Sequence, residues 1–151
     1  MAEKFVQSIC EKYYIIRFPT LFGERKNKLF GFVDKVIIAL KKNKNLKIAK
    51  DRIDTPTYAK DAAMKLLDIL QKKKTYGIYH LANSGKVSYY EFVLFIKKLL
   101  KSKSKITSVK DEYFKSKGFK PLRTAIMSKK LSGMRSWEDA IKNYLEANKN
   151  V

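Results

Sequence analysis

Cysteine and histidine are almost absent from the sequence, which contains one of each, Cys10 and His80. A single cysteine excludes an intramolecular disulfide framework and a cysteine-based zinc site, and it favours a reducing compartment. No group of His, Cys, Asp and Glu has the spacing of metal ligands. His80 lies in a short apolar run, where a histidine is more often packed than catalytic. The sequence therefore predicts no metal site and no histidine-based catalysis.

Glycine-rich and long apolar segments are missing as well. The six glycines form neither a dinucleotide-binding fingerprint nor a Walker A loop, and no serine lies in a nucleophile elbow. The longest apolar runs, 36–40 and 92–96, are far shorter than the roughly 18–20 residues of a membrane-spanning helix. Charged residues such as Glu3 and Lys4 interrupt any signal-peptide core. We therefore expect a soluble cytoplasmic protein with no membrane partner and no catalytic residues of its own.

Acidic residues are scarce: 14 Asp and Glu stand against 34 Lys and Arg, so the formal net charge is +20. Such an excess is typical of nucleic-acid-binding proteins, because Lys and Arg neutralise phosphates. Only five of the 34 are Arg, the residue preferred for bidentate recognition of bases and phosphates. The Lys clusters follow predicted helices, where cations complement the helix dipole. We interpret the charge mainly as a solvated Lys-rich surface, with nucleic-acid binding as the less favoured alternative.

The 151 residues, 45% of them hydrophobic, suffice for a single domain over 1–151. Helical and strand patterns alternate along the chain, which indicates the α/β class. Helices are expected over 3–12 and 28–43 and after the N-cap candidates Thr57, Ser88 and Ser136. Short buried strands are expected over 13–17, 46–49, 77–81 and 105–109. The segment 110–135 is expected to be irregular, apart from one helical turn near 128–131.

Several segments, taken in order, resemble a known family. They are RFPTLFG at 17–23, DRIDTPTYAKD at 51–61, GIYHLANSG at 77–85, SYYEF at 88–92, KPLRT at 120–124, SKKL at 128–131 and WEDA at 137–140. In this order they resemble the C-terminal half of dTDP-4-dehydrorhamnose reductase, an extended short-chain dehydrogenase/reductase that acts on a nucleotide sugar. The resemblance covers nearly the whole chain. It implies an α/β fold with an incomplete Rossmann-type sheet, made of late strands, and a small α/β substrate-binding region.

The same resemblance implies which parts of the enzyme this chain lacks. In the family a Tyr-x-x-x-Lys pair supplies the general acid, and the residues that follow it resemble 2–6 of this sequence. The pair, the catalytic Thr or Ser and the glycine-rich dinucleotide-binding turn would then lie upstream. Reduction needs a bound nicotinamide and a proton donor, so we expect this C-terminal half to be inactive alone. NADPH or NADH would serve the complete protein, and none is expected to bind this chain alone.

The resemblance also implies partners and site residues. The expected partners are a dTDP-sugar and an N-terminal reductase half, or a second copy that pairs through an exposed sheet edge. Phe18 and Pro19 would lie beside the nicotinamide, and Thr20 beside the sugar ring. Phe-Pro-Thr at 18–20 replaces the Thr-Ser-Trp often found in the reductase, so Thr20 stands where a Trp would pack on the deoxysugar. Arg17 would reach the pyrophosphate, whereas Asp61 is expected to serve the first turn of its helix and the fold rather than the substrate.

Basic residues further along the chain are predicted to bind the nucleotide phosphates. Lys26 and Lys28 lie at the N-terminal end of the helix predicted over 28–43, where backbone N–H groups favour anions. Arg52 belongs to a loop that resembles the one flanking the nucleotide. Lys120 and Arg123 match an Arg-Pro segment near the substrate phosphates, with Lys120 where Arg is usual.

A non-catalytic role is the second hypothesis. The sequence RFP at 17–19, followed by LFGE at 21–24, also resembles the regulatory beta subunit of methionine adenosyltransferase, which keeps the fold and acts as a binding partner. A half-built sheet would leave an open edge and apolar faces for such contacts. The helix over 28–43 and the strand over 13–17 are then the candidate contact surfaces.

Overall fold

The computed structural model describes residues 1–24, 31–115, 118 and 121–148. Its helices are α1 (Ala2–Ile9), α2 (Phe32–Lys41), α3 (Ala59–Gln71), α4 (Tyr89–Leu99), the short 3-10 helix η1 (Asp111–Phe114) and α5 (Trp137–Ala147). Its strands are β1 (Tyr14–Arg17), β2 (Leu21–Phe22), β3 (Leu46–Ala49), β4 (Ile53–Asp54), β5 (Thr57–Tyr58), β6 (Gly77–His80), β7 (Val87–Ser88) and β8 (Ile106–Val109). Within the described residues no helix is long and apolar enough to cross a membrane.

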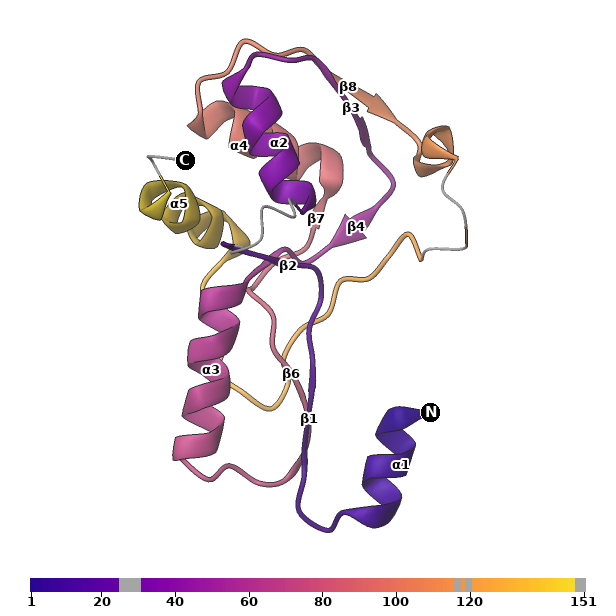
Figure 1. Cartoon of the computed structure of the whole chain (residues 1–151), viewed down its shortest axis with the longest axis vertical. Helices are drawn as coiled ribbons and strands as arrows, with labels where there is room; N and C mark the ends of the chain where they lie inside the picture. The colour runs from indigo at the N-terminus through magenta and orange to yellow at the C-terminus, as the bar shows by residue number, and fades with distance from the viewer. Residues whose placement is uncertain (25–30, 116–117, 119–120, 149–151) are drawn as a thin grey trace.

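The elongated lower part of the molecule is a parallel strand pair with one helix on either side (Figure 1). β1 and β6 pair in parallel from Tyr14 opposite Gly77 to Arg17 opposite His80. Alternate strand residues point to opposite faces of a sheet, and one face of this pair packs against α3. That contact is a small core of Ile69, Tyr79 and Leu81, to which Tyr14, Ile16, Leu66, Leu131 and Met134 add partly buried surface.

The upper part is a separate, larger core built from α2, α4 and α5 and the parallel pair β3–β8. Its helices bury aromatic and branched side chains at helical spacing, such as Val33, Val36 and Leu40 of α2. Tyr144 of α5 donates a hydrogen bond of 2.8 Å to Asp34 of α2, and the burial of its hydroxyl raises the pKa of Tyr144. A side-chain hydrogen bond therefore joins α5 to α2 beside the upper core.

Two short strand pairs connect the upper and lower parts. β2 pairs in parallel with β5, and β4 pairs antiparallel with β7. Asn83, which follows β6, is 1% exposed and accepts a hydrogen bond from the Tyr58 amide at 2.8 Å. The backbone N–H of Asn83 donates to the Thr57 hydroxyl at 3.1 Å, so buried hydrogen bonds hold the chain segments at the connection together.

The helix ends test the capping predictions directly. Ser88 and Glu91 form the expected capping box, and Ser136 accepts the expected bond from the Asp139 amide. The prediction for Thr57 was wrong: α3 begins after Tyr58, while Thr57 is a buried strand residue whose hydroxyl bonds the Thr55 carbonyl. A buried hydroxyl needs hydrogen-bond partners, and here they are the Thr55 carbonyl and the Asn83 backbone N–H rather than an N–H of α3.

The segment between β8 and α5 differs from the prediction in two places. It begins with η1, a helical turn that the sequence pattern did not indicate. No helical turn forms at 128–131, which the structure describes as bends and irregular chain. Leu131 there packs against the small core of β6 and α3, so burial of its side chain replaces local helix formation. The first residues of the helix expected over 28–43 lie outside the described residues, and α2 begins at Phe32.

Candidate functional site

A pocket lies at the carboxyl end of β1, where Phe18, Pro19 and Thr20 leave the strand. We call it the strand-end pocket; its volume is about 340 Å³. Its other walls come from segments far along the chain, namely Arg52, Asp54, Tyr89, Pro121 and Thr124. In open α/β sheets, ligands bind outside the carboxyl ends of parallel strands, so this pocket has the position of a ligand site.

Asp54 gives the strand-end pocket a fixed carboxylate. Its side chain is almost completely buried, at 2% exposure, and accepts the Thr20 hydroxyl hydrogen bond. The Thr55 amide donates a second hydrogen bond to it at 2.8 Å. A buried carboxylate needs such partners, because an unpaired charge away from water is costly. Thr20 is thereby anchored to the pocket wall.

Arg52 lies between the strand-end pocket and a second pocket. Its guanidinium donates two parallel hydrogen bonds of 2.9 Å each to the Asp111 carboxylate. It also lies over the Tyr89 ring, 5.6 Å from the ring centroid. Burial disfavours the charged guanidinium, but the hydrogen bonds and charge of Asp111 outweigh it, so the pKa of Arg52 is raised. The cation is permanent and is held in one orientation.

The second pocket, which we call the aromatic pocket, has a volume of about 210 Å³. Phe32, Tyr89 and Phe114 supply rings to its lining, and Lys47, Ile48, Ala49, Arg52 and Asp111 complete it. The rings of Phe32 and Tyr89 lie 4.7 Å apart between centroids. Arg52 and Tyr89 are common to both pockets, so the two cavities meet at one shared wall.

Arg17 lies outside both pockets. Its guanidinium pairs with Glu3 of α1, with Nε 3.0 Å and Nη2 2.5 Å from the two carboxylate oxygens. The hydrogen bond from Arg17 is the main cause of the lowered pKa of Glu3. The Nε2 atom of His80 lies 3.4 Å from Arg17 Nη1. Arg17 therefore ties α1 to the strand pair, and its predicted contact with a pyrophosphate stays a prediction.

Of the other residues predicted to bind phosphate, the structure describes Arg123. Arg123 is exposed and forms a backbone bridge with Ile53, while the next amide, of Thr124, donates to the Ile53 carbonyl at 3.0 Å. This pairing holds residues 123–124 beside Ile53, and Thr124 lines the strand-end pocket. Lys26, Lys28 and Lys120 lie outside the described residues.

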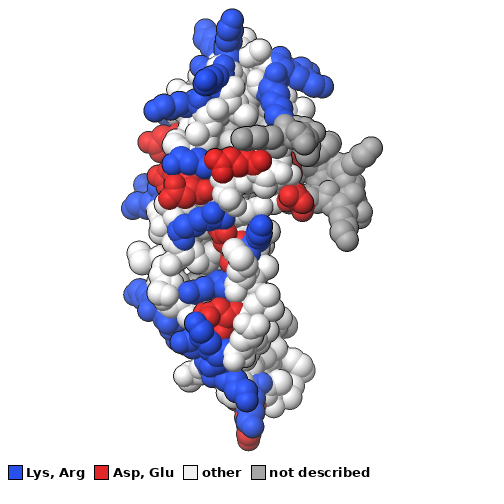
Figure 2. Space-filling view, turned by 90° about the vertical axis from the view of Figure 1, so that its left-hand side faces the viewer, with Lys and Arg blue, Asp and Glu red and all other residues white. Residues whose placement is uncertain are grey.

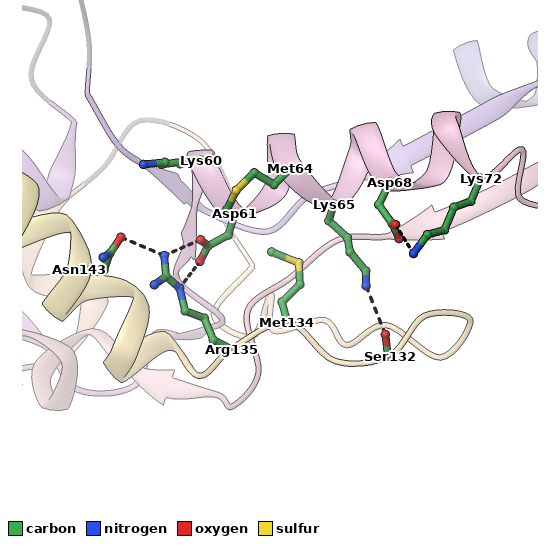
Figure 3. Close-up of a pocket in the computed structure, with 10 residues that line it drawn as sticks. All are labelled: Lys60, Asp61, Met64, Lys65, Asp68, Lys72, Ser132, Met134, Arg135 and Asn143. Carbon is green, nitrogen blue, oxygen red and sulfur yellow. Dashed lines mark hydrogen bonds and ion pairs between the residues drawn. The ribbon is translucent and has the colours of Figure 1, made fainter.

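A third cavity, which we call the α3 pocket, lies between α3, the segment before α5 and α5 itself (Figure 3). Arg135 donates hydrogen bonds of 2.8 and 2.5 Å to the two oxygens of Asp61, which is 7% exposed. The Asn83 side chain donates to the same carboxylate at 2.9 Å. Asp61 was expected to serve the first turn of α3 and the fold, and the structure identifies Arg135 and Asn83 as its long-range partners. Its role as a long-range partner leaves no signal in the local sequence.

The spacing of a Tyr-x-x-x-Lys pair occurs once within the chain, at Tyr113 and Lys117. Residues four apart meet when they lie on one α-helix. Tyr113 instead lies on the four-residue η1, where its hydroxyl accepts a hydrogen bond from Lys47 at 2.6 Å, and Lys117 lies outside the described residues. Among the described residues there is also no group of three or more His, Cys, Asp and Glu that could hold a metal ion.

The parallel strand pairs, the helices around them and the pocket at the strand ends define a Rossmann-like α/β protein. The RmlD substrate binding domain matches residues 1–150, and the chain belongs to this family. The α/β class and the Rossmann-type sheet pieces expected from the sequence are thereby confirmed.

Individual relatives agree with the family assignment. The chain is 27% identical to the spore coat polysaccharide biosynthesis protein SpsK of Bacillus subtilis (strain 168), over 97% of this chain and 51% of that protein. It is 35% identical to the dTDP-4-dehydrorhamnose reductase of Aggregatibacter actinomycetemcomitans, over 62% of this chain and 33% of that protein. The crystal structure of dTDP-4-dehydrorhamnose reductase from Bacillus anthracis, in complex with NADP, superposes with a TM-score of 0.87 at 26% identity, covering 97% and 52% of the two chains. The SpsK protein and the Bacillus anthracis reductase each match 97% of this chain, but the chain covers only 51% and 52% of them, so it spans about half of their length.

Proposed function

We propose that this chain is the sugar-nucleotide-binding part of a dTDP-4-dehydrorhamnose reductase-like protein, which reduces a 4-keto-deoxysugar nucleotide with NAD(P)H. The observation that carries the proposal is the shared wall of the two pockets. Arg52 and Tyr89 line both, so one elongated ligand can occupy the aromatic pocket and the strand-end pocket together. A nucleotide sugar has this shape, with a flat base at one end, a sugar at the other and a diphosphate between.

The chemistry of each pocket favours one end of that ligand. The aromatic pocket receives the base, because aromatic rings such as Phe32 and Tyr89 stack on base faces. The diphosphate passes Arg52, whose planar guanidinium matches phosphate oxygens. Asp111 occupies Nε and Nη2 of Arg52, so a phosphate that binds two of the guanidinium nitrogens must share one of them with that carboxylate or displace it.

The sugar end of the ligand lies in the strand-end pocket. Thr20 and Asp54 supply hydroxyl and carboxylate groups there, which can bond sugar hydroxyls. Thr20 has less surface to cover a sugar face than the Trp often found at this place in the reductase. We propose that hydrogen bonds made by Thr20 and Asp54 replace ring stacking on the sugar.

A nicotinamide ring would lie against Phe18 and Pro19, at the carboxyl end of β1. A dinucleotide binds its pyrophosphate at a glycine-rich turn between a parallel strand and the N-terminus of a helix. No such turn follows a parallel strand among the described residues, so they do not fit a whole dinucleotide. The cofactor would supply a hydride when bound. The proposed contribution of this chain is to hold the sugar beside the ring, while a second half binds the rest of the cofactor.

The lower part of the molecule offers a surface for that second half. The backbone carbonyls of Tyr13 and Arg17 accept hydrogen bonds from Gly77 and Leu81 of the β6 segment. Backbone groups alternate in direction along a strand, so those of Tyr14 and Ile16 point to the opposite edge, which is open within the described residues. The helices α1 and α3 lie on either side of the strand pair (Figure 1), and each exposes an apolar side chain, Phe5 by 66% and Leu67 by 55%. An open parallel edge is a surface onto which a sheet can continue, and helices with exposed apolar side chains can be covered at the same time.

Two measurements test the proposal. Calorimetry with dTDP-rhamnose should report binding to this chain and a loss of about tenfold for Tyr89→Ala, with the exposed Tyr76→Ala as the control. A reductase assay should detect no NADPH oxidation by the chain alone, but turnover when it is fused behind the dinucleotide-binding half of the Bacillus anthracis reductase. Turnover by the chain alone would contradict the division of labour, and silence in calorimetry would contradict the sugar-nucleotide site.

A further inference from the structure

The α3 pocket is large, open to solvent and separate from the two pockets assigned above. Its volume is about 680 Å³, and it shares no lining residue with either of them. It follows α3 from Lys60 to Lys72, which is about 18 Å of helix at 1.5 Å per residue. A groove of that length accommodates about five or six residues of extended chain.

The charged groups of the α3 pocket offer hydrogen-bond donors rather than acceptors. Both oxygens of Asp61 are already bonded by Arg135. Asp68 pairs with Lys72 at 2.6 Å. Among the described residues, by contrast, Lys60 has no hydrogen-bond or ion-pair partner, and Lys65 has only the Ser132 hydroxyl, at 3.3 Å. An incoming group must therefore accept hydrogen bonds, which favours a carboxylate or a phosphate.

Arg135 strengthens this preference. Its Nε and Nη2 bond Asp61, and Nη2 also bonds Asn143 of α5 at 3.2 Å. Within the described part of the chain its Nη1 has no partner, and one third of the side chain is exposed. The buried carboxylate thus holds the guanidinium in place, with one nitrogen left for a ligand. Because the guanidinium is already held in place, less side-chain entropy is lost when it binds a ligand than when a mobile lysine does.

The middle of the groove is apolar. Figure 3 shows Met64 of α3 and Met134 of the facing segment between the Arg135 end and the Lys72 end. Two thioether side chains on opposite walls form an adaptable contact for an apolar side chain. None of the pocket's lining residues is aromatic, so it lacks the stacking surface on which bases of single-stranded nucleic acids bind.

The surface around the groove has the same sign of charge. Figure 2 views the molecule from the side on which α3 lies, and over the lower half of that face Lys and Arg far outnumber Asp and Glu. Lys72, Lys73 and Lys74 end the α3 segment, and Lys129 and Lys130 lie on the exposed segment that precedes the groove wall. Such a field draws in and orients acidic partners before contact.

From these features we propose that the α3 pocket is a docking groove for an acidic peptide segment of a partner protein, with an apolar residue between its carboxylates. The apolar residue lies between Met64 and Met134, and carboxylates on either side bind Lys60 with Arg135 at one end and Lys65 at the other. This interaction does not depend on sugar-nucleotide binding, because the groove and the two other pockets have separate walls.

Fluorescence anisotropy of a labelled peptide, Glu-Glu-Leu-Leu-Glu-Glu, with the 151-residue chain tests the proposal. Replacing the leucines by serine should weaken binding several-fold, and replacing the glutamates by glutamine should abolish it. The double variant Lys60→Glu with Lys65→Glu should bind about tenfold more weakly. Its matched control, Lys103→Glu with Lys105→Glu, changes the net charge equally at exposed positions away from the groove and should bind within about twofold of the parent.

A second pair of variants tests the apolar contact. Met64→Gln should weaken peptide binding about threefold to fivefold, whereas Leu67→Gln, one turn further along α3 and equally exposed, should leave it unchanged. Equal losses for both charge-reversal pairs, or tighter binding of a twelve-nucleotide oligothymidylate that ignores Met64, would overturn the proposal in favour of a general polyanion surface. Absence of peptide binding by the folded chain would also overturn it.

Discussion

Arg135 and Asp61 are 74 positions apart in the sequence, yet two guanidinium nitrogens of Arg135 lie 2.8 and 2.5 Å from the oxygens of Asp61. The pair joins α3 of the lower part to the segment that leads into α5 of the upper part. Asn83, after β6, bonds both Asp61 and the Arg135 carbonyl. Three chain segments from both parts of the molecule therefore meet at one carboxylate.

Removing this carboxylate should destabilise the fold strongly. Asp61→Ala leaves Arg135 without its main partner and Asn83 with a buried unpaired N–H, and loss of one member of a buried pair costs about 3 kcal/mol. Urea unfolding measures the change. Asp68→Ala on the same helix removes an exposed pair with Lys72 and should cost less than about 1 kcal/mol. Equal costs for the two variants would show that the Asp61 network does not hold the parts together.

Gly85 should tolerate no side chain. Its φ is +89°, and a β-carbon would lie 2.9 Å from Trp137, whose ring makes edge contacts with Phe92 and Phe95. Gly85→Ala should therefore cost about 2 kcal/mol, from backbone strain and overpacking. Gly133→Ala is the control, since no described atom lies within 4 Å of the added carbon. Thermal unfolding should separate the two variants, and an unchanged midpoint for Gly85→Ala would contradict the packing of Trp137.

Arg52 and Asp111 should have opposite effects on ligand affinity. Arg52→Met removes the cation at the shared pocket wall and should weaken dTDP-sugar binding about tenfold. Asp111→Asn removes the competing charge from the guanidinium and should strengthen binding several-fold. Calorimetry at matched ionic strength measures both. A loss of affinity in both variants, with both proteins folded, would mean that the pair acts as a structural unit rather than as competing partners.

Acid should weaken the capping box at the start of α4. The hydrogen bonds from Ser88 hold the pKa of Glu91 below its usual value. A lowered pKa in the folded state means that the stabilisation is fully present above the unfolded pKa of about 4.3 and is lost as pH falls through the lower folded pKa. Glu91→Gln should therefore lose less stability than the parent between pH 5 and pH 3 in urea unfolding. Parallel losses would contradict the assignment.

The sequence predicted the elements with strong local signals. Both serine N-caps, Ser88 and Ser136, were correctly placed because their partners lie three residues away. The paired strands over 14–17 and 77–80 were predicted within a residue from their apolar runs. Thr57 was misplaced because its hydroxyl bonds a buried carbonyl, which residue type alone does not reveal.

The site was only partly predictable for the same reason. The sequence predicted Phe18, Pro19, Thr20 and Arg52 as site residues, and all four line the strand-end pocket, while their contacts with a ligand stay predictions. The aromatic pocket combines Phe32, Tyr89 and Phe114 from three separate helices, and their approach depends on tertiary packing. The pairing of Arg17 with Glu3 could not be predicted, because Glu3 is an ordinary surface residue by sequence, and the contact of Arg17 with a pyrophosphate stays a prediction.

Amide chemical shifts recorded during titration with dTDP-rhamnose report where on the chain the ligand binds, and so test whether the two pockets form one sugar-nucleotide site. We predict saturable shifts at Phe18, Thr20 and Arg52, together with Tyr89 and Phe114 at the aromatic end. The α3 pocket residues from Lys60 to Lys72 should not respond. Shifts confined to those lysines, or no saturable shift near Arg52 and Tyr89, would contradict a sugar-nucleotide site at the shared wall of the two pockets.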